Sequence, residues 1–304
     1  MKQPPSTPDD LEYVPCELCG ADDTKLVFVV EGDRLVRCRR CGLIYVNPRP
    51  SASLRDQVYA RDYFQKEVFK PPTHPAPSES DTSWNRQRFR LVAAGRPPGR
   101  LLDVGCGTGH FLATAKQHGW QVAGVEYSSY AAEVAREAAR VDVHVGTLED
   151  SRFPPGSFDA LSLLHVLEHV PHPRRTVRRI HELLSEKGRL LIEVPDFGSP
   201  HARELRGRWS NIKPQEHLYY FTLETLRVLL QLEGFRIVTI RRTGGLGVLG
   251  AGENPAQPAA WARPLYELRR WLGPTPRLRN FLRYLYWDVL RQHDNLLIVA
   301  EKIR

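Results

Sequence analysis

The chain has 304 residues, of which 41% are hydrophobic and 26% charged, and this balance excludes a wholly disordered chain because enough apolar surface is present to form a core. No run of about 18 apolar residues occurs, and the polar start at 1–10 lacks the apolar stretch of a secretory signal, which favours a cytoplasmic protein. The net charge of +8 and the pI near 9.3 leave nucleic acid or an anionic membrane surface open as partners, although arginines spread along a chain mostly form a solvated surface.

The first element in chain order is a candidate metal module over 13–50. Four cysteines form two Cys-x2-Cys pairs separated by 18 residues, a spacing typical of zinc sites: Cys16, Cys19, Cys38 and Cys41. Zn²⁺ takes four thiolates in a tetrahedron, and each pair brings two sulfur atoms to one point. Two disulfides are the alternative, which a reducing compartment disfavours. Since nothing nearby offers an open coordination position, we expect a structural zinc ribbon with a β-hairpin between the pairs.

Residues 51–83 are expected to connect this module to the remainder of the chain. Helical spacing is present over 51–69, whereas 70–83 is rich in proline and serine and is predicted to be a linker. A basic amphipathic helix is then predicted over 84–94, because its arginines alternate with apolar residues and no acidic residue is present.

From residue 100 the sequence alternates between short apolar runs and helical stretches. Seven runs are predicted to be strands: 101–104, 122–125, 141–145, 158–165, 189–194, 235–240 and 296–300. Runs that are apolar on both faces and separated by helices are typical of a parallel sheet covered by helices on both sides. The segment 243–293 is expected to be a helical insertion that acts as a lid, with contact to lipid or a membrane surface and stacking on nucleic acid as alternatives.

The first predicted strand ends in a glycine-rich turn, Leu-Leu-Asp-Val-Gly-Cys-Gly-Thr-Gly at 101–109. Glycines permit a tight strand-to-helix turn and a close approach of a ligand. Glu126 ends the second predicted strand, where a carboxylate can accept hydrogen bonds from ribose hydroxyls. The dinucleotide fingerprint is Gly-x-Gly-x-x-Gly. Because the spacing here is Gly-x-Gly-x-Gly with Asp103 ahead of it, the turn suits a ligand with cationic amine and sulfonium groups.

Residues 100–242 resemble the class I S-adenosylmethionine-dependent methyltransferases that act on small molecules. Besides the glycine turn, the matching motifs are Gly-Val-Glu at 124–126, Val-Gly-Thr-Leu-Glu-Asp at 145–150, Ser-Phe-Asp at 157–159, His-Val-Leu-Glu-His-Val at 165–170 and Glu-His-Leu-Tyr-Tyr-Phe-Thr at 216–222. The resemblance implies a doubly wound, seven-stranded Rossmann-like α/β sheet within a methyltransferase domain over 84–304. The end of the metal module, Cys-Gly-Leu-Ile-Tyr-Val-Asn-Pro-Arg-Pro at 41–50, resembles the N-terminal zinc module of a bacterial subset of these enzymes.

The resemblance also implies a binding site for S-adenosylmethionine. Its nine residues would be Asp103, Gly105, Gly107, Gly109, Glu126, Tyr127, Thr147, Leu148 and Glu149. The three glycines would shape the loop around the methionine part, and Asp103 would hold that loop and the amino group. Glu126 would bind the ribose, while Tyr127 and the segment 147–149 would form two walls around the adenine.

Three ionisable residues follow the fourth predicted strand at positions i, i+3 and i+4, namely His165, Glu168 and His169. They would share one face if this segment is helical. The spacing also occurs in inverted zinc peptidases, but it is more similar to the Glu-x-x-Glu-His magnesium cluster of ubiquinone-pathway O-methyltransferases and small-RNA 2′-O-methyltransferases. His165 replaces the first glutamate of that cluster, which counts against magnesium. The remaining interpretations are a general base at His165 or His169 and a turn that these residues merely orient.

His217 is the third candidate catalytic residue. In the enzymes that this chain resembles, the segment after the fifth strand often forms a wall of the acceptor pocket, and Trp209 is a candidate for the same wall. A structural role at a helix start, with Thr222 as the N-cap, is the alternative for this segment.

The function that this resemblance implies is transfer of a methyl group from S-adenosylmethionine to a small-molecule acceptor. A sugar, a lipid-linked precursor or a quinone-like precursor would fit, with methylation at oxygen or carbon and with peripheral contact to a membrane as a possibility. The alternative is an RNA methyltransferase that uses the zinc ribbon to bind RNA. A third reading is a non-enzymatic scaffold with a vestigial cofactor fold, which the complete set of Asp103, glycines and Glu126 disfavours.

Overall fold

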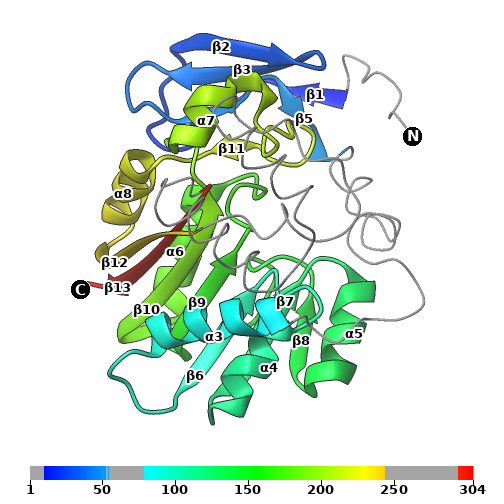
Figure 1. Ribbon diagram of the computed structural model, residues 1–304, viewed down its shortest axis with the longest axis vertical. Coiled ribbons are helices and arrows are strands. Elements are labelled where there is room, and N and C mark those ends of the chain that lie inside the picture. Colours follow the sequence, from blue (N-terminus) through cyan, green and yellow to red (C-terminus); the bar gives the residue numbers. More distant parts are fainter. Residues whose placement is uncertain (1–9, 53, 55–78, 244–293, 304) are drawn as a thin grey trace, which may run out of the picture.

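The computed structural model describes residues 10–52, 54, 79–243 and 294–303 (Figure 1). Along the chain its strands and helices are β1 Leu11–Glu12, β2 Thr24–Val30, β3 Asp33–Cys38, β4 Ile44–Val46, β5 Arg49–Pro50, α3 Glu79–Ala93, β6 Arg100–Val104, α4 His110–Gln117, β7 Gln121–Glu126, α5 Ser129–Ala139, β8 Asp142–Val145, β9 Phe158–Leu164, α6 Pro173–Leu183, β10 Leu184–Pro195, α7 Pro200–Leu205, the 3₁₀ helix η3 Arg206–Arg208, β11 Tyr219–Tyr220, α8 Leu223–Leu232, β12 Phe235–Thr243 and β13 Asn295–Lys302. Most of the predicted 51–69 helix, and all but the first residue of the 243–293 insertion, lie outside the described residues.

The centre of the larger part is a seven-stranded sheet with the order β12-β13-β10-β9-β6-β7-β8. All seven predicted runs are strands, and β6 to β10 pair in parallel. The expectation of a wholly parallel sheet is wrong for β13, which runs antiparallel to both of its neighbours because it enters the sheet between β10 and β12 from the opposite end. The strand order reverses between β6 and β9, and ligands of such sheets bind beyond the carboxyl ends of the strands at this point.

Helices cover both faces of this sheet, and the side-chain alternation along its strands explains why. Leu101 and Leu191 join one apolar cluster with α3, α4 and α5, whereas Leu102 and Leu190 join the other cluster with α6 and α8. Successive residues of a strand point to opposite faces, so a strand that is apolar at every position can be buried only between two layers. The doubly wound Rossmann-like arrangement is therefore confirmed.

Two helix starts can be compared with their sequence signals. Helix α8 begins after Thr222, as predicted, through a reciprocal cap in which Thr225 N–H donates to the Thr222 hydroxyl at 3.3 Å and Thr222 N–H donates to the Thr225 hydroxyl at 2.9 Å. Helix α3 begins at Glu79, five residues before the predicted start at 84. The linker predicted over 70–83 therefore overlaps the first turn of α3, because a serine-rich composition does not locate the end of a helix.

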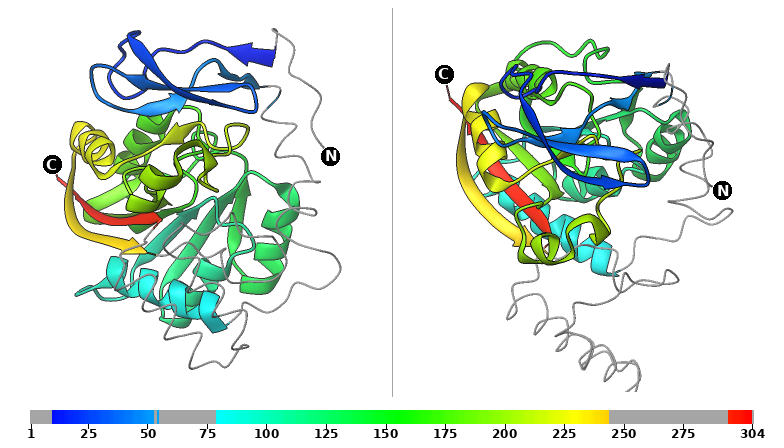
Figure 2. Two further views of the ribbon diagram at one scale, coloured as in Figure 1. Left: turned by 45° about the horizontal axis from the view of Figure 1, so that its top comes forward. Right: turned by 90° about the horizontal axis from the view of Figure 1, so that it is seen from above.

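The N-terminal module is a second, four-stranded sheet with the order β11-β4-β3-β2, beside a short β1-β5 pair. The expected hairpin joins β2 to β3 through Glu31 and Gly32, which both have positive φ. Figures 1 and 2 show this sheet above the end of the larger sheet, with α7 and β11 between them. Its apolar face packs through Leu35 and Ile44 against Leu205 and Trp209. Among the described residues, no helix is both long and apolar enough to cross a membrane.

Candidate functional site

The glycine turn between β6 and α4 contains three glycines with φ of +70°, +52° and +80°, a region that favours glycine over all other residues. A Cβ at Gly105 would lie 2.4 Å from Val166 Cγ2, and a Cβ at Gly109 would lie 3.0 Å from Ala135 Cβ. At Gly107 a Cβ would meet no atom of the described residues within 4 Å. The outer glycines are therefore required for packing, whereas Gly107 borders open space into which a ligand can approach the backbone.

Two buried carboxylates, Asp103 and Glu126, lie beneath this turn, and Glu126 is the one that bonds to the loop. Glu126 accepts hydrogen bonds from Gly107 N–H at 2.8 Å and from Ser128 N–H at 2.9 Å, so Glu126 holds the loop. Asp103, which was expected to do so, instead accepts from the Ser162 hydroxyl at 2.6 Å. Burial raises the pKa of both groups, that of Asp103 to about 7. Each Glu126 oxygen can still accept a second hydrogen bond, as a ribose hydroxyl would require.

The residues expected around the adenine lie next to the carboxyl ends of β7 and β8. Tyr127 is 44% exposed, so its ring is accessible to a ligand. Leu148 is buried, and the Thr147 side chain bonds within its own turn. The Glu149 carboxylate accepts from the Thr176 hydroxyl of α6 at 2.8 Å and is thus engaged away from the loop. Glu149 can therefore contribute to a wall through its backbone more readily than through its side chain.

His165 follows β9 directly, but the segment after it is a turn and not a helix. Its φ is +58°, and its N–H donates to the Glu193 carbonyl at 2.8 Å, which continues the strand pairing. The only helix-like bond of the segment is His169 N–H to Val166 O at 2.9 Å. The condition for a shared helical face at 165, 168 and 169 is therefore not met. His165 Nδ1 still lies 3.6 Å from Glu168 Oε1, and its side chain is 35% exposed at the crevice.

The turn and the segment before β11 bring His217 into the same cluster. The His169 and His217 rings are 4.7 Å apart, edge to face. His169 Nδ1 lies 2.9 Å from the Glu216 carbonyl, and His217 Nδ1 lies 2.9 Å from the Asn211 carbonyl. A carbonyl oxygen only accepts, so both Nδ1 atoms carry the proton and the neutral rings keep their lone pairs on Nε2. The two imidazoles thus lie beside the buried Glu168.

Charge in this cluster is concentrated on Glu168. Burial alone would raise its pKa, but the imidazole of His165 and the nearby His169 lower the pKa to about 2. For His165, burial alone would lower the pKa, but the carboxylates of Glu168 and Glu193 near the ring raise the pKa above its ordinary value overall. For His217, burial lowers the pKa to about 3. At neutral pH the cluster therefore contains an ionised carboxylate and a neutral His217.

Glu168, His169 and His217 each offer one ligand atom within 4.8 Å of the others, and so could hold a metal ion. Both carboxylate oxygens of Glu168 are buried without a hydrogen bond in the part of the chain that the structure describes, which is costly unless an ion or ligand satisfies them. Two imidazoles with one carboxylate suit a transition ion such as Zn²⁺ or Fe²⁺ better than Mg²⁺. His217 thus completes this group of possible ligands, while His165 lies beside Glu168 outside it.

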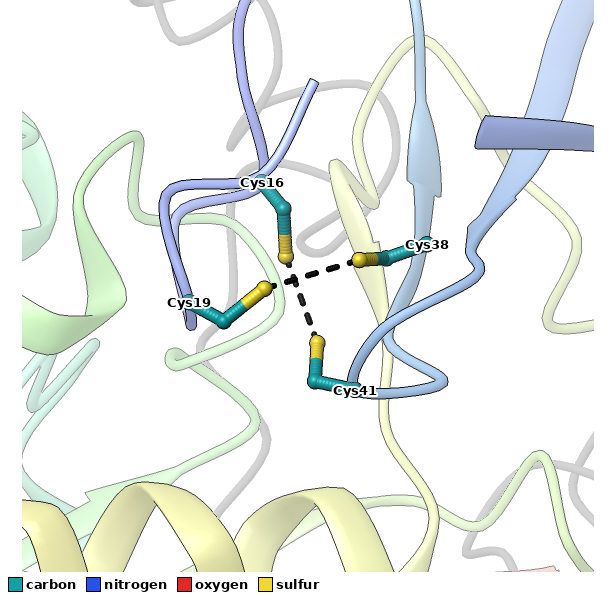
Figure 3. Close-up of side chains that lie close together, drawn as sticks. All are labelled: Cys16, Cys19, Cys38 and Cys41. Atoms are coloured by element: carbon teal, nitrogen blue, oxygen red, sulfur yellow. Dashed lines mark hydrogen bonds between the residues drawn. The ribbon is translucent and has the colours of Figure 1, made fainter. Parts of the chain in front are cut away.

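The four cysteines converge as their spacing predicts (Figure 3). The Sγ atoms of Cys16 and Cys41 lie 3.4 Å apart, and those of Cys19 and Cys38 lie 3.5 Å apart. Each of these short contacts joins one cysteine from each pair, so the four sulfurs surround one point. A zinc ion with Zn–S bonds of about 2.3 Å requires sulfur atoms roughly 3.8 Å apart, whereas a disulfide requires about 2.05 Å. The arrangement fits a four-coordinate metal.

Trp209 and a buried ion pair lie in places that the sequence does not predict. Trp209, expected near the acceptor, is buried with its ring 6.0 Å from Phe197, at the contact between α7 and the N-terminal module. A buried ion pair that was not predicted from the sequence joins Arg88 of α3 to Glu193 of β10 at 2.6 Å. This pair supports the strand next to His165. Helical periodicity gave a signal, since Arg88 lies on the same buried face as Phe89.

Residues 79–240, more than half of the chain, match the family described as "Methyltransferase domain". The ubiquinone biosynthesis O-methyltransferase of Xanthomonas campestris pv. campestris (strain B100) is 36% identical over 118 residues, covering 36% of this chain and 49% of that protein. The corresponding protein of Xanthomonas euvesicatoria pv. vesicatoria (strain 85-10) is 36% identical over 111 residues, covering 34% and 45%. The chain spans about half the length of the curated relatives it matches.

Solved structures with the same fold include a geranyl diphosphate methyltransferase in complex with S-adenosylmethionine. It has a TM-score of 0.51 and 20% identity, and the match covers 73% of this chain and 86% of that one. The PH0226 protein from Pyrococcus horikoshii OT3 has a TM-score of 0.52 and 17% identity, with 80% and 99% covered. At these identities the likeness concerns the fold.

Proposed function

Because the chain belongs to the family of proteins with a methyltransferase domain, we propose that it transfers a methyl group from S-adenosylmethionine to a small-molecule acceptor. The observation that carries the proposal is the open space at Gly107, whose N–H is fixed by the buried Glu126. A loop held in this way at the carboxyl end of the central strand leaves its backbone groups and the second lone pairs of Glu126 available to one ligand.

Methyl transfer is an in-line displacement at a sulfonium carbon, so the protein contributes mainly by positioning the two reactants. His165 and its turn follow β9, which is the neighbour of β6 in the sheet, and the turn contacts the glycine loop through Val166. The turn therefore occupies the place at which an acceptor would meet the methyl group. We assign the acceptor side of the site to this turn together with His217.

The three histidines are suited to different tasks. A pKa of about 3 makes His217 too weak a base to keep a proton at neutral pH, while the raised pKa of His165 favours its protonated form. His169, with its lone pair on Nε2, is the proposed general base for an acceptor hydroxyl. A divalent ion held by Glu168, His169 and His217 would instead lower the pKa of that hydroxyl directly. Both routes favour methylation at oxygen.

The acceptor class is proposed to be a quinone-like, lipid-linked or sugar precursor. The relatives named ubiquinone biosynthesis O-methyltransferase support a small hydroxylated acceptor over RNA. We further propose that the four cysteines hold one Zn²⁺, supported by the convergence of their Sγ atoms. The proposed zinc would be structural, since all four positions of a tetrahedral ion are filled by sulfur.

The test is transfer of isotope-labelled methyl from S-adenosylmethionine into a fractionated extract of the source organism, with Gly107→Arg as the matched control. We expect label in a lipid, sugar or small-metabolite fraction with the wild-type protein alone. Label in RNA would replace the proposal with the RNA alternative. Calorimetric titration with S-adenosylhomocysteine is run in parallel, and a wild-type protein that fails to bind this product would refute the assignment of the cofactor site.

A further inference from the structure

The N-terminal sheet is completed by a strand from the methyltransferase part of the chain. Strand β11 pairs antiparallel with β4, with Tyr219 opposite Tyr45 and Tyr220 opposite Ile44. Next to this ladder, Val46 N–H donates to the Leu218 carbonyl at 3.0 Å. In Figure 1, β11 accordingly lies between the N-terminal module and the larger sheet. The module is thus hydrogen-bonded to the residues that directly follow His217.

The same short strand also holds the turn that carries Glu168. The N–H groups of Leu218 and Tyr219 both donate to the Glu168 carbonyl, at 2.9 Å and 3.2 Å. Leu218 therefore accepts from the N-terminal module with its carbonyl and donates to the Glu168 turn with its N–H. Leu218 therefore links β4 to the backbone of Glu168 through two hydrogen bonds.

A buried arginine of the module provides a second connection to this turn. Arg49 of β5 is 2% exposed, and its Nη1 donates to the Pro171 carbonyl at 2.7 Å and to the Tyr219 hydroxyl at 2.8 Å. The Tyr219 hydroxyl donates in turn to the Pro171 carbonyl at 2.8 Å. The Arg49 charge is paired with Glu12 of β1 at 2.9 Å. Three hydrogen bonds thereby close a triangle between the module, β11 and the end of the Glu168 turn.

The cysteine cluster fixes the strands from which these connections start. Cys38 ends β3, and its N–H donates to the Leu43 carbonyl at 2.9 Å, while Gly42 N–H donates back to the Cys38 carbonyl at 3.0 Å. Cys41 lies in this turn, three residues before the first residue of β4. A metal held by the sulfurs would set the start of β4 and, through β4, the position of β11.

We propose that the N-terminal module is a positioning element of the acceptor side of the site, with Arg49 and β4 as the residues that hold the Glu168 turn and His217 in place. This inference rests on the proposed function for the meaning of the site, but its physical content is independent of the acceptor. A module that served only to bind RNA would have no need of a buried arginine bonded to Pro171. A module that only stabilised the fold would act on β6 and β7 as strongly as on this turn.

The test compares Arg49→Met with Arg39→Met in the full chain, zinc-loaded, by amide hydrogen exchange. Arg39 is the matched control because it belongs to the same module but is 59% exposed beside Asp23. We expect Arg49→Met to speed exchange at the amides of Leu218 and Tyr219 by roughly tenfold or more, with unchanged exchange in β6 and unchanged affinity for S-adenosylhomocysteine. Arg39→Met is expected to change none of these quantities.

Tyr219→Phe keeps the ring and removes only the hydroxyl, so it serves if Arg49→Met fails to fold, and a smaller increase is expected at the same amides. With an active extract fraction, both variants should lower the maximal rate of label transfer without changing the KM for S-adenosylmethionine. Unchanged exchange at Leu218 and Tyr219 in both variants would overturn the inference. So would an equal loss of protection in β6, since that is general destabilisation. Because hydrogen exchange and the affinity for S-adenosylhomocysteine are measured without an acceptor, the inference and the proposed function can fail separately.

Discussion

The two glycines at 105 and 107 predict a clear division between stability and cofactor binding. Both have positive φ, which costs a residue with a Cβ about 1–2 kcal/mol. Only at Gly105 does the new Cβ also overlap a neighbour, Val166 Cγ2 at 2.4 Å, and overpacking of this kind adds about 1–3 kcal/mol. Gly105→Ala should thus lose about 2–5 kcal/mol and Gly107→Ala about 1–2 kcal/mol, at roughly 2–4 °C in Tm per kcal/mol.

Thermal unfolding with and without S-adenosylhomocysteine is the assay. At a ligand concentration of 100 times Kd, the wild-type protein should gain about 2.7 kcal/mol. Gly107→Arg should lose this gain, because its side chain enters the space in which we place the cofactor, while its unliganded Tm should fall about as far as that of Gly107→Ala. Gly105→Ala should recover about 1–3 kcal/mol when combined with Val166→Ala, which removes the overlapping methyl group.

Two results would refute this reasoning. If Gly107→Arg keeps the full stabilisation by S-adenosylhomocysteine, the cofactor does not approach Gly107. If Gly105→Ala is no less stable than Gly107→Ala, or if Val166→Ala gives no recovery, the packing of the turn against Val166 is not the cause of the glycine requirement.

Three further predictions concern the buried charges and the cysteines. Burial raises the folded-state pKa of Asp103 from 3.8 to about 7, so the stabilising contribution of this group is complete below about pH 4 and is lost as the pH rises through 7. In denaturant titrations, the free energy of unfolding of Asp103→Asn should therefore rise relative to wild type by up to about 4 kcal/mol across this window. A difference that stays constant with pH would contradict the prediction. Arg88→Met leaves the buried Glu193 without its guanidinium partner, although the Thr243 hydroxyl still donates to it at 2.9 Å. The change should cost about 3–5 kcal/mol in the same assay, and a loss below 1 kcal/mol would be inconsistent with a buried pair. Cys38→Ser should abolish zinc in elemental analysis, whereas Cys106→Ser should retain it; zinc in both variants would show that the metal lies elsewhere.

The parts of the fold that follow from local patterns could be predicted from the sequence. Apolar runs that show no polar face gave all seven strands and the two-sided helix cover, because alternation along a strand fixes which layers it must meet. The cysteine spacing predicted the convergence of the four sulfur atoms, and Thr222 predicted the start of α8. In each case, the residues that determine the structure are a few positions apart in the chain or recur with a fixed period.

The parts of the site that depend on distant pairing could not be predicted. His217 joins Glu168 and His169 as a possible metal ligand because the segment before β11 lies beside their turn. No pattern in β11 or β4 predicts that these two short strands pair. The hydrogen bonds of Asp103 and Glu126 have a similar origin. Both are buried acids near the glycine turn, and only the path of the loop decides which one meets the N–H of Gly107.

The pairing of β4 with β11 has a consequence for synthesis of the chain. More than half of all residues lie between Tyr45 and Tyr219, so the N-terminal sheet lacks its outer strand until most of the protein has left the ribosome. Until then Leu35 and Ile44 also lack their apolar cover of Leu205 and Trp209. The first segment to be synthesised is therefore among the last to reach its final contacts. During that interval the nascent chain exposes the unpaired edge of β4, which can pair with other chains.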